Sequence, residues 1–253
     1  MPAGEFVRKL RARERAIGYW AMLDAPAAVE RLGLVGYDYV CLDGQHGLFG
    51  YQGMLNGLIA LDAAGGSAPI ARVDANNPTS ICRALDAGAV GVIVPLVDDA
   101  EQAAAAVAAT RYPPEGVRSY GPARSALRIG PEPAAANEQV AVLAMIETPR
   151  GLANVERICA TPGLDAVYIG PSDLRLAVGG AHPADPAVQQ EFEDALRRIR
   201  TAGEQAGIAV GIHTPDGATA RRRLGEGFTF ASISCDVEHL QQVAADHLAT
   251  ARG

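Results

Sequence analysis

Lysine is almost absent from this chain of 253 residues. Of its 22 basic side chains 21 are arginine, and Lys9 is the only lysine. Imine chemistry requires a lysine amine placed at the reacting carbonyl. Lys9 stands in an arginine-rich run ahead of the first predicted strand, where we expect the solvated face of an N-terminal helix. Imine catalysis is therefore disfavoured.

Cysteine is also scarce and scattered. The four cysteines are far apart and include no C-x-x-C pair: Cys41, Cys82, Cys159 and Cys235. This spacing argues against a disulfide framework and against a zinc knuckle. A reducing cytoplasm is the expected location.

Long apolar runs and basic stripes are missing as well. The most apolar run, Ala89 to Val97, is far shorter than the roughly 20 residues of a membrane span and contains Pro95. Charges interrupt the N-terminal segment before a signal-peptide core could form. The net charge is −7, and no basic stripe is interleaved with aromatics. We therefore expect neither a membrane nor a nucleic-acid partner.

What the chain does contain is one repeating pattern. Short apolar or β-branched runs alternate with turn signals and alanine-rich or amphipathic stretches, which is typical of βα units around a parallel sheet. Eight strands are predicted: Ile17–Met22, Tyr39–Asp43, Pro69–Val73, Gly91–Pro95, Val142–Glu147, Ala166–Gly170, Ala209–His213 and Phe228–Ser234. Eight units without a linker predict a single α/β domain over residues 1–253, a (β/α)8 TIM barrel. A doubly wound open sheet is the alternative.

One segment interrupts this pattern. Residues 111–140 are too long for a plain connection, and such segments are often functional or disordered. Three arginines beside Tyr120 favour contact with an anion. The segment is predicted to be a lid or an interface loop, with a solvated surface loop as the alternative.

Polar residues at the carboxyl ends of the strands are the candidates for chemistry, since barrel enzymes place their sites there. Asp43 and His46 lie three residues apart after the second strand, close enough for the carboxylate to orient an imidazole that exchanges a proton. Arg72 ends the third strand, and its fork suits a bidentate carboxylate. A structural loop histidine, and a salt bridge from Arg72 to Asp74 or across the barrel mouth, are the alternatives.

Two carboxylates end neighbouring strands. Glu147 follows the fifth strand and Asp173 the sixth, and a hard divalent ion such as Mg²⁺ between them would remove their repulsion and polarise a carbonyl. Two unrelated helix-capping carboxylates explain the spacing equally well. The turn Gly170-Pro171-Ser172-Asp173 leaves backbone N–H groups accessible to an anion, although a tight turn without a ligand is common.

Six motifs together resemble the HpcH/HpaI family of metal-dependent (class II) pyruvate aldolases. They are LDGQHG, the RV strand end with Arg72, LDAGAVGVIVPLVDDAEQA, TRYPPEGVRSYG, LAMIET and YIGPSDL, and the resemblance runs from about Gly18 to Asp236. It implies a barrel, usually a hexamer of dimers that exchange their last helix, which cleaves or forms 4-hydroxy-2-oxo acids through a pyruvate enolate. Pyruvate or hydroxypyruvate and an aldehyde would be the small-molecule partners. We expect a homo-oligomer, a hexamer or a dimer.

The resemblance also implies roles for individual residues. Glu147 and Asp173 match the ligands of a divalent metal (Mg, Mn or Co), Arg72 the arginine that holds the pyruvate oxygens, and Asp43 with His46 the acid/base dyad. Gly170, Pro171 and Ser172 match the turn that binds the pyruvate carboxylate, and we place Trp20 and His213 beside the substrate. A class I aldolase would need a lysine at a barrel strand, which this chain lacks.

The chain departs from better-known members at three positions. Gln45 stands where they commonly have glutamate, Met145 where they often have glutamine, and His213 where leucine is common. The first two changes remove polar or charged groups near the pyruvate site. His213 could favour a hydroxylated or acidic aldehyde tail.

Three hypotheses follow for the function. The first is a metal-dependent aldolase acting on a 4-hydroxy-2-oxo acid. The second is a related carbon–carbon lyase or decarboxylase that uses the same enolate site on an oxaloacetate-like or specialised substrate. The third is a non-catalytic barrel that binds a keto acid.

Overall fold

Eight parallel strands close into a barrel in the computed structural model, which describes residues 3–253. The strands pair in chain order from β1 to β8, and β8 pairs with β1. Their bounds are β1 Ala16–Ala21, β2 Tyr39–Asp43, β3 Ala68–Arg72, β4 Gly91–Val94, β5 Ala141–Ile146, β6 Ala166–Ile169, β7 Ala209–Thr214 and β8 Phe230–Cys235. The predicted TIM barrel is confirmed, the open sheet is wrong, and every predicted strand overlaps an observed one.

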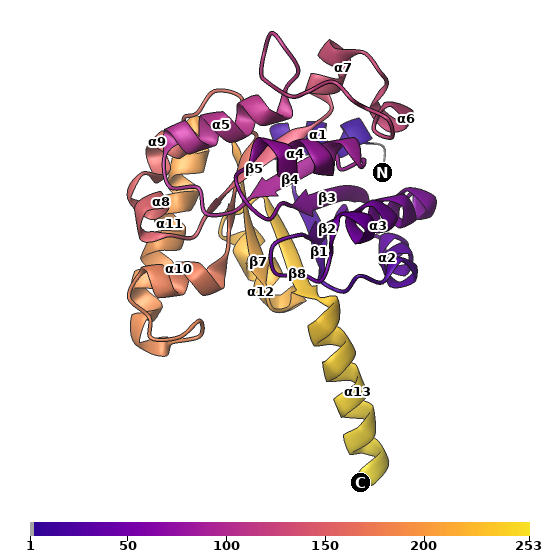
Figure 1. Cartoon of the computed structure of the whole chain (residues 1–253). Coiled ribbons are helices and arrows are strands. Elements are labelled where there is room, and N and C mark those ends of the chain that lie inside the picture. Colours follow the sequence, from indigo (N-terminus) through magenta and orange to yellow (C-terminus); the bar gives the residue numbers. More distant parts are fainter. Residues whose placement is uncertain (1–2) are drawn as a thin grey trace.

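Helices surround the barrel (Figure 1). Their bounds are α1 Ala3–Arg11, α2 Pro26–Gly33, α3 Tyr51–Ala64, α4 Pro78–Asp86, α5 Ala100–Thr110, α6 Ala126–Ile129, α7 Pro133–Glu138, α8 Pro149–Ala153, α9 Val155–Cys159, α10 Pro171–Ala177, α11 Gln189–Ala206, α12 Gly217–Gly225 and α13 Asp236–Arg252, with a 3-10 turn at Pro186–Val188. Side-chain oxygens of Asn77, Thr148 and Asp216 accept the first-turn N–H groups of α4, α8 and α12. These caps satisfy donors that a helix leaves unpaired, so the chain turns from strand to helix at these points.

The barrel is filled by side chains and is closed at its amino end by α1. Phe6, Val7 and Leu10 of α1 are buried against the interior cluster. Above them Tyr39 and Tyr168 both hydrogen-bond the Ser232 hydroxyl, at 2.8 and 2.7 Å. These rings form a rigid floor for anything placed at the carboxyl ends of the strands.

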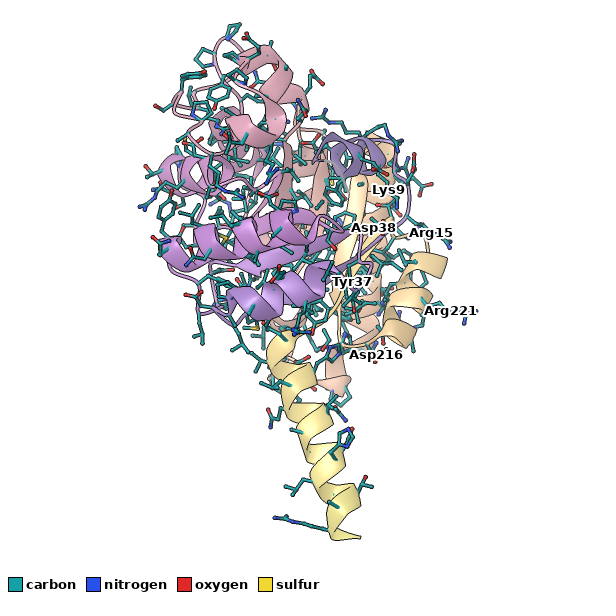
Figure 2. All side chains as sticks on the ribbon, turned by 90° about the vertical axis from the view of Figure 1, so that its right-hand side faces the viewer. Lys9, Arg15, Tyr37, Asp38, Asp216 and Arg221 are labelled. Atoms are coloured by element: carbon teal, nitrogen blue, oxygen red, sulfur yellow. The ribbon has the colours of Figure 1, made fainter. Side chains whose placement is uncertain are left out.

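Lys9 lies at the amino end of the barrel. Its Nζ is 2.7 Å from Asp38 Oδ1, and both side chains are 22% exposed. Asp38 directly precedes β2, whereas Asp216 follows β7 at the opposite end. Figure 2 shows Lys9 beside Asp38 and well away from Asp216 and the base of α13. The expectation that Lys9 is merely solvated is therefore wrong, because it holds α1 to the barrel.

Residues 111–140 also lie at the amino end, since they connect the end of α5 to the start of β5. Figure 1 places α6 and α7 at the end of the molecule opposite α13. The segment therefore cannot be a lid over this chain's own strand ends. Its arginines pair with carboxylates of the chain: Arg111 with Asp165, Arg118 with Asp86, and Arg124 and Arg128 with Asp62. The expected external anion is thus replaced by internal partners, and an interface role stays a proposal.

The last helix projects from the barrel. α13 has no buried residue and extends as a single rod away from the other elements (Figure 1). Outside the barrel, Ile17 of β1 is 38% exposed, although the other residues of that strand are buried. No helix within residues 3–253 has both the length and the apolar character needed to cross a membrane.

Candidate active site

A pocket of about 200 Å³ opens at the carboxyl ends of the strands. It brings together all ten residues to which the sequence assigned a catalytic, substrate-binding or metal-binding role: Trp20, Asp43, His46, Arg72, Glu147, Gly170, Pro171, Ser172, Asp173 and His213. Its volume is below that of pockets for drug-sized ligands, so it suits a small substrate. Their placement together is a feature of the structure, whereas their individual roles stay predictions.

A second hollow of about 280 Å³ lies between α3 and α4 and shares only Arg72 with this pocket. Asp74 is the one carboxylate among the described residues that line it, and no histidine lines it. We therefore place the chemistry in the smaller pocket, where carboxylates, histidines and Arg72 converge.

Asp43 and Arg72 form a buried ion pair at the base of the pocket. Register pairs them across β2 and β3, with Arg72 Nε 2.8 Å from Asp43 Oδ1 and Nη2 2.5 Å from Oδ2. Asp43 also accepts the Trp20 indole N–H at 3.1 Å. Burial raises the pKa of Asp43, but the hydrogen bonds and charge of Arg72 outweigh that effect and hold this pKa below its ordinary value. Asp43 is therefore a fixed anion that orients the guanidinium.

This pairing corrects the expected geometry of the dyad. Asp43 Oδ1 accepts the backbone N–H groups of Gln45 and His46, at 3.0 and 3.2 Å, so it shapes the loop that carries the histidine. The carboxylate is otherwise engaged with Arg72 and Trp20, and it meets His46 at its backbone rather than at its imidazole. Arg72 therefore makes its bidentate pair with Asp43 through Nε and Nη2, and its Nη1 lies outside the pair. The alternative partner Asp74 is not used.

Glu147 is a buried carboxylate held by a backbone group. Its side chain is almost fully buried, and Oε1 accepts the Leu96 N–H at 2.9 Å. Leu96 adopts a left-handed backbone conformation with φ of 55°, which is strained for a residue with a side chain. Burial raises the pKa of Glu147, the Leu96 N–H lowers it, and the nearby Asp173 raises it further.

The arrangement of Glu147 and Asp173 fits a cation. A Cβ built on Gly170 would lie 2.4 Å from Glu147 Oε2, so any larger residue at position 170 would clash with this oxygen. Asp173 is exposed in the first turn of α10 and faces the same pocket. No group of three or more His, Cys, Asp or Glu side chains in residues 3–253 could by itself hold a metal ion. The two carboxylates would therefore leave positions for water and substrate oxygens, which a hard divalent ion accepts.

Trp20 reaches the pocket because of an irregularity between β1 and β8. The register shifts between Tyr19 and Trp20, and Ser234 of β8 has a φ of 48°. A bulge of this kind re-aims side chains. The Trp20 ring stacks on Tyr168 at 5.5 Å and 13°, and its centroid lies 5.5 Å from that of His213 at 76°.

His213 lies at the end of β7 with its imidazole largely buried. Burial lowers the pKa of His213 to about 4, although the Glu238 carboxylate raises it and Arg72 lowers it. The imidazole is therefore neutral around neutral pH, with one nitrogen as a donor and the other as an acceptor.

Sequence reasoning missed several pocket residues. Glu238 lines the pocket from the first turn of α13. Three others also line it: Tyr168 from β6, Cys235 from the end of β8 and Met22 from just after β1. The position of Glu238 four residues after Ser234, at a strand-to-helix junction, was the available signal. Nothing in the sequence marks Leu96, because its contribution is a backbone N–H in an unusual conformation.

Comparison with known proteins gives this site its context. The family profile described as HpcH/HpaI aldolase/citrate lyase matches residues 16–242. The chain belongs to this family. It is 38% identical over 237 residues to a 5-keto-4-deoxy-D-glucarate aldolase of Salmonella paratyphi C, covering 92% of this chain and 91% of that one.

Solved structures agree with that assignment. A family protein from Burkholderia cenocepacia J2315 superposes with a TM-score of 0.90 at 35% identity, covering 99% of this chain and 100% of that one. The citrate synthase SbnG superposes with a TM-score of 0.85 at 26% identity, covering 97% and 96%. The present chain is therefore an enzyme of the aldolase type, a carbon–carbon lyase acting on small molecules. The hypothesis of a non-catalytic barrel is set aside.

Proposed function

We propose that this family member cleaves and forms a 4-hydroxy-2-oxo acid, with pyruvate or hydroxypyruvate and an aldehyde as the partners, with the help of a divalent cation. The observation that carries the proposal is the placement of Glu147 and Asp173 in one pocket with the Asp43–Arg72 pair. The Salmonella relative's name supports it, since 5-keto-4-deoxyglucarate numbered from its other end is a 4-hydroxy-2-oxo acid.

Glu147 and Asp173 would hold the cation, which supplies Lewis-acid polarisation of the keto group when bound. Arg72, fixed by Asp43, would present Nη1 to the pyruvate oxygens and stabilise negative charge as the enolate develops. The first-turn N–H groups of Ser172 and Asp173 have no partner within α10 and would receive the carboxylate.

His46 would move the proton of the aldehyde-derived hydroxyl. In condensation, pyruvate loses one methyl proton, its C3 bonds to the aldehyde carbon, and the aldehyde oxygen takes a proton; cleavage reverses each change. The His46 side chain is exposed at the pocket rim, within reach of a substrate entering there. Its backbone is fixed by Asp43, so its placement does not require an imidazole–carboxylate bond.

Metal removal tests this proposal. EDTA should abolish cleavage of a 4-hydroxy-2-oxo acid, and Mg²⁺, Mn²⁺ or Co²⁺ should restore it. Glu147→Gln should lose activity by about 100-fold or more, whereas Glu101→Gln, the same change on the exposed face of α5, should not. Full activity in EDTA together with an unharmed Glu147→Gln variant would show that the metal mechanism is wrong.

A second function is favoured by the likeness to the citrate synthase SbnG and by Met145, an apolar side chain in the pocket. It is a carbon–carbon lyase or decarboxylase that acts on an oxaloacetate-like substrate at the same site. The two functions separate when the rate of oxaloacetate decarboxylation is compared with the rate of aldol cleavage in one preparation. Aldol cleavage should be the faster reaction.

We also propose that the protein is a homo-oligomer, a dimer or hexamer, in which α13 packs against a second copy. The support is a stripe of exposed apolar residues on α13 that includes Val237, Leu240 and Leu248, and the uncovered Ile17 on β1. Light scattering should show that Leu240→Arg lowers the molar mass, while Gln242→Arg on the opposite face does not. For residues 111–140 the proposed role is likewise an interface, through the exposed Val117 and Leu127.

A further inference from the structure

The pocket has a polar side that the proposed function leaves unused. Glu147 and Asp173 occupy the β5–β6 side, where the oxo acid would bind. The β7–β8–β1 side carries His213, Cys235, Glu238 and Trp20, and we call these four residues the tail lobe. The part of the substrate beyond the new carbon–carbon bond would lie here.

Glu238 is held at this lobe by a local hydrogen bond. The Ser234 hydroxyl donates to Glu238 Oε2 at 2.8 Å across the junction between β8 and α13. Ser234 adopts a left-handed backbone conformation at this junction, and Cys235 follows as the last residue of β8. This bond places the exposed Glu238 side chain beside the pocket, and Oε1 is outside the bond.

No cation in the described part of the chain compensates Glu238 at the lobe. Among the described residues that line the pocket, Arg72 is the one lysine or arginine, and it is paired with Asp43. The lining holds four carboxylates against that single guanidinium. A divalent cation would offset Glu147 and Asp173, and the oxo-acid carboxylate would then add a negative charge. The excess charge on the tail side is negative.

His213 gives the lobe a neutral polar group. The T-shaped contact with Trp20 positions the imidazole ring, and burial keeps it uncharged around neutral pH. A neutral imidazole offers one donor and one acceptor, whereas a carboxylate such as that of Glu238 offers only acceptors. Together they match hydroxyl groups, which donate and accept. A carboxylate only accepts, so it would meet the Glu238 oxygens with no hydrogen to donate.

We propose that Glu238 and His213 make this enzyme selective for aldehydes with a neutral, hydroxylated tail, and that Glu238 rejects a tail carboxylate. The inference rests on the proposed function and sharpens its substrate class. It sets this chain apart from its Salmonella relative, because a glucarate-derived substrate carries a carboxylate at both ends. For His213, the proposal favours the hydroxylated tail over the acidic one.

The test uses two aldehydes that differ in one group. Glyceraldehyde and 2-hydroxy-3-oxopropanoate share their carbon skeleton, with CH2OH in the first where the second has a carboxylate. With pyruvate and Mg²⁺, the wild-type holoenzyme should prefer glyceraldehyde in kcat/KM by about 10- to 100-fold. Glu238→Gln, which keeps an acceptor for Ser234, should reduce that preference by about tenfold. Glu191→Gln, on the exposed face of α11, removes the same charge elsewhere and should leave the ratio unchanged.

A second variant tests the histidine. His213→Leu should lower kcat/KM for glyceraldehyde by about tenfold, mainly through KM, and should leave propanal, which lacks the hydroxyls, within about twofold. An equal loss of kcat/KM for both aldehydes would show that His213 is only structural, and it would overturn the proposed part of His213 in aldehyde selectivity.

The same preparations separate this inference from the proposed function. Exchange of the pyruvate methyl protons into D2O reports the enolate site without any aldehyde. Three results with normal exchange would show that the inference on Glu238 is wrong while the enolate site stands. The wild type could prefer the aldehyde with the carboxylate, the wild type could condense neither aldehyde, or Glu238→Gln could show the same preference ratio as the wild type. If metal-loaded enzyme shows no exchange, the proposed function fails and the inference fails with it.

Discussion

Replacing Asp43 distinguishes two roles for this carboxylate. If Asp43 acts on Arg72, Asp43→Asn should raise the KM for pyruvate and leave the shape of the kcat/KM profile against pH unchanged. If it acted on the imidazole of His46, the variant should move that profile instead. The structure supports the first outcome, because both carboxylate oxygens bind Arg72 and the histidine is met only at its backbone N–H.

The magnitude follows from the burial of the pair. Asp43 is fully buried and Arg72 is 8% exposed, so Asp43→Ala leaves a guanidinium without a counter-charge. Removing one partner of a buried pair costs about 3–5 kcal/mol of unfolding free energy. Asp43→Asn keeps one acceptor oxygen and should cost about 2 kcal/mol. The loosened guanidinium should raise the KM for pyruvate about 10- to 100-fold, since each tenfold change corresponds to about 1.4 kcal/mol.

Urea unfolding and steady-state kinetics on the same protein would measure both effects. Asp74→Asn is the matched control, since Asp74 follows Arg72 closely in sequence and lies exposed in the neighbouring hollow. It should change neither stability nor KM. The reasoning is refuted if Asp43→Asn keeps wild-type stability and the wild-type KM for pyruvate. It is also refuted if the variant shifts the profile of kcat/KM against pH, as expected if Asp43 acted on the imidazole of His46.

Three further predictions concern separate parts of the barrel. Lys9→Met should lower the unfolding free energy by about 1 kcal/mol, because it removes the half-buried ion pair with Asp38. Borohydride added with pyruvate should trap no adduct on the wild-type protein, and inactivation by borohydride would contradict the absence of a lysine imine. Gly170→Ala should cut activity and Mg²⁺ affinity at least about tenfold, because its Cβ would meet Glu147 Oε2, and unchanged Mg²⁺ titration would exclude that clash as important. For His213, the folded pKa of about 4 lies below the ordinary 6.5, so the unfolded chain binds the proton first and stability falls as pH drops from about 6.5 towards 4, by on the order of 2–3 kcal/mol. His213→Gln should lose less stability over that range in thermal unfolding, and an equal loss would contradict the assignment.

The fold could be predicted because its signals are local and repeated. Each strand appears as an apolar run, and caps such as Asn77 and Asp216 mark where helices begin. The candidate site could be predicted for the same reason, since closing a parallel barrel brings the residue after every strand to one end. Polar residues at those points therefore share a pocket whatever their separation in sequence.

Pairings within the pocket could not be predicted in this way. Asp43 is three residues from His46 and 29 from Arg72, yet register across β2 and β3 gives the carboxylate to Arg72. Leu96 reaches Glu147 through a left-handed backbone that no residue type announces. The placement of residues 111–140 depends on which end of the barrel an α-to-β connection occupies.

The sequence by itself therefore determined the barrel, the ends of its strands and many of the polar residues gathered there, because hydrophobic periodicity and turn chemistry act over a few residues. Only the tertiary structure decided which partner Asp43 holds, that Lys9 is at the far end, and that Glu238 stands beside His213. Those relations depend on strand register, on a bulge between β1 and β8, and on the path of α13, which are set by the closure of the whole barrel.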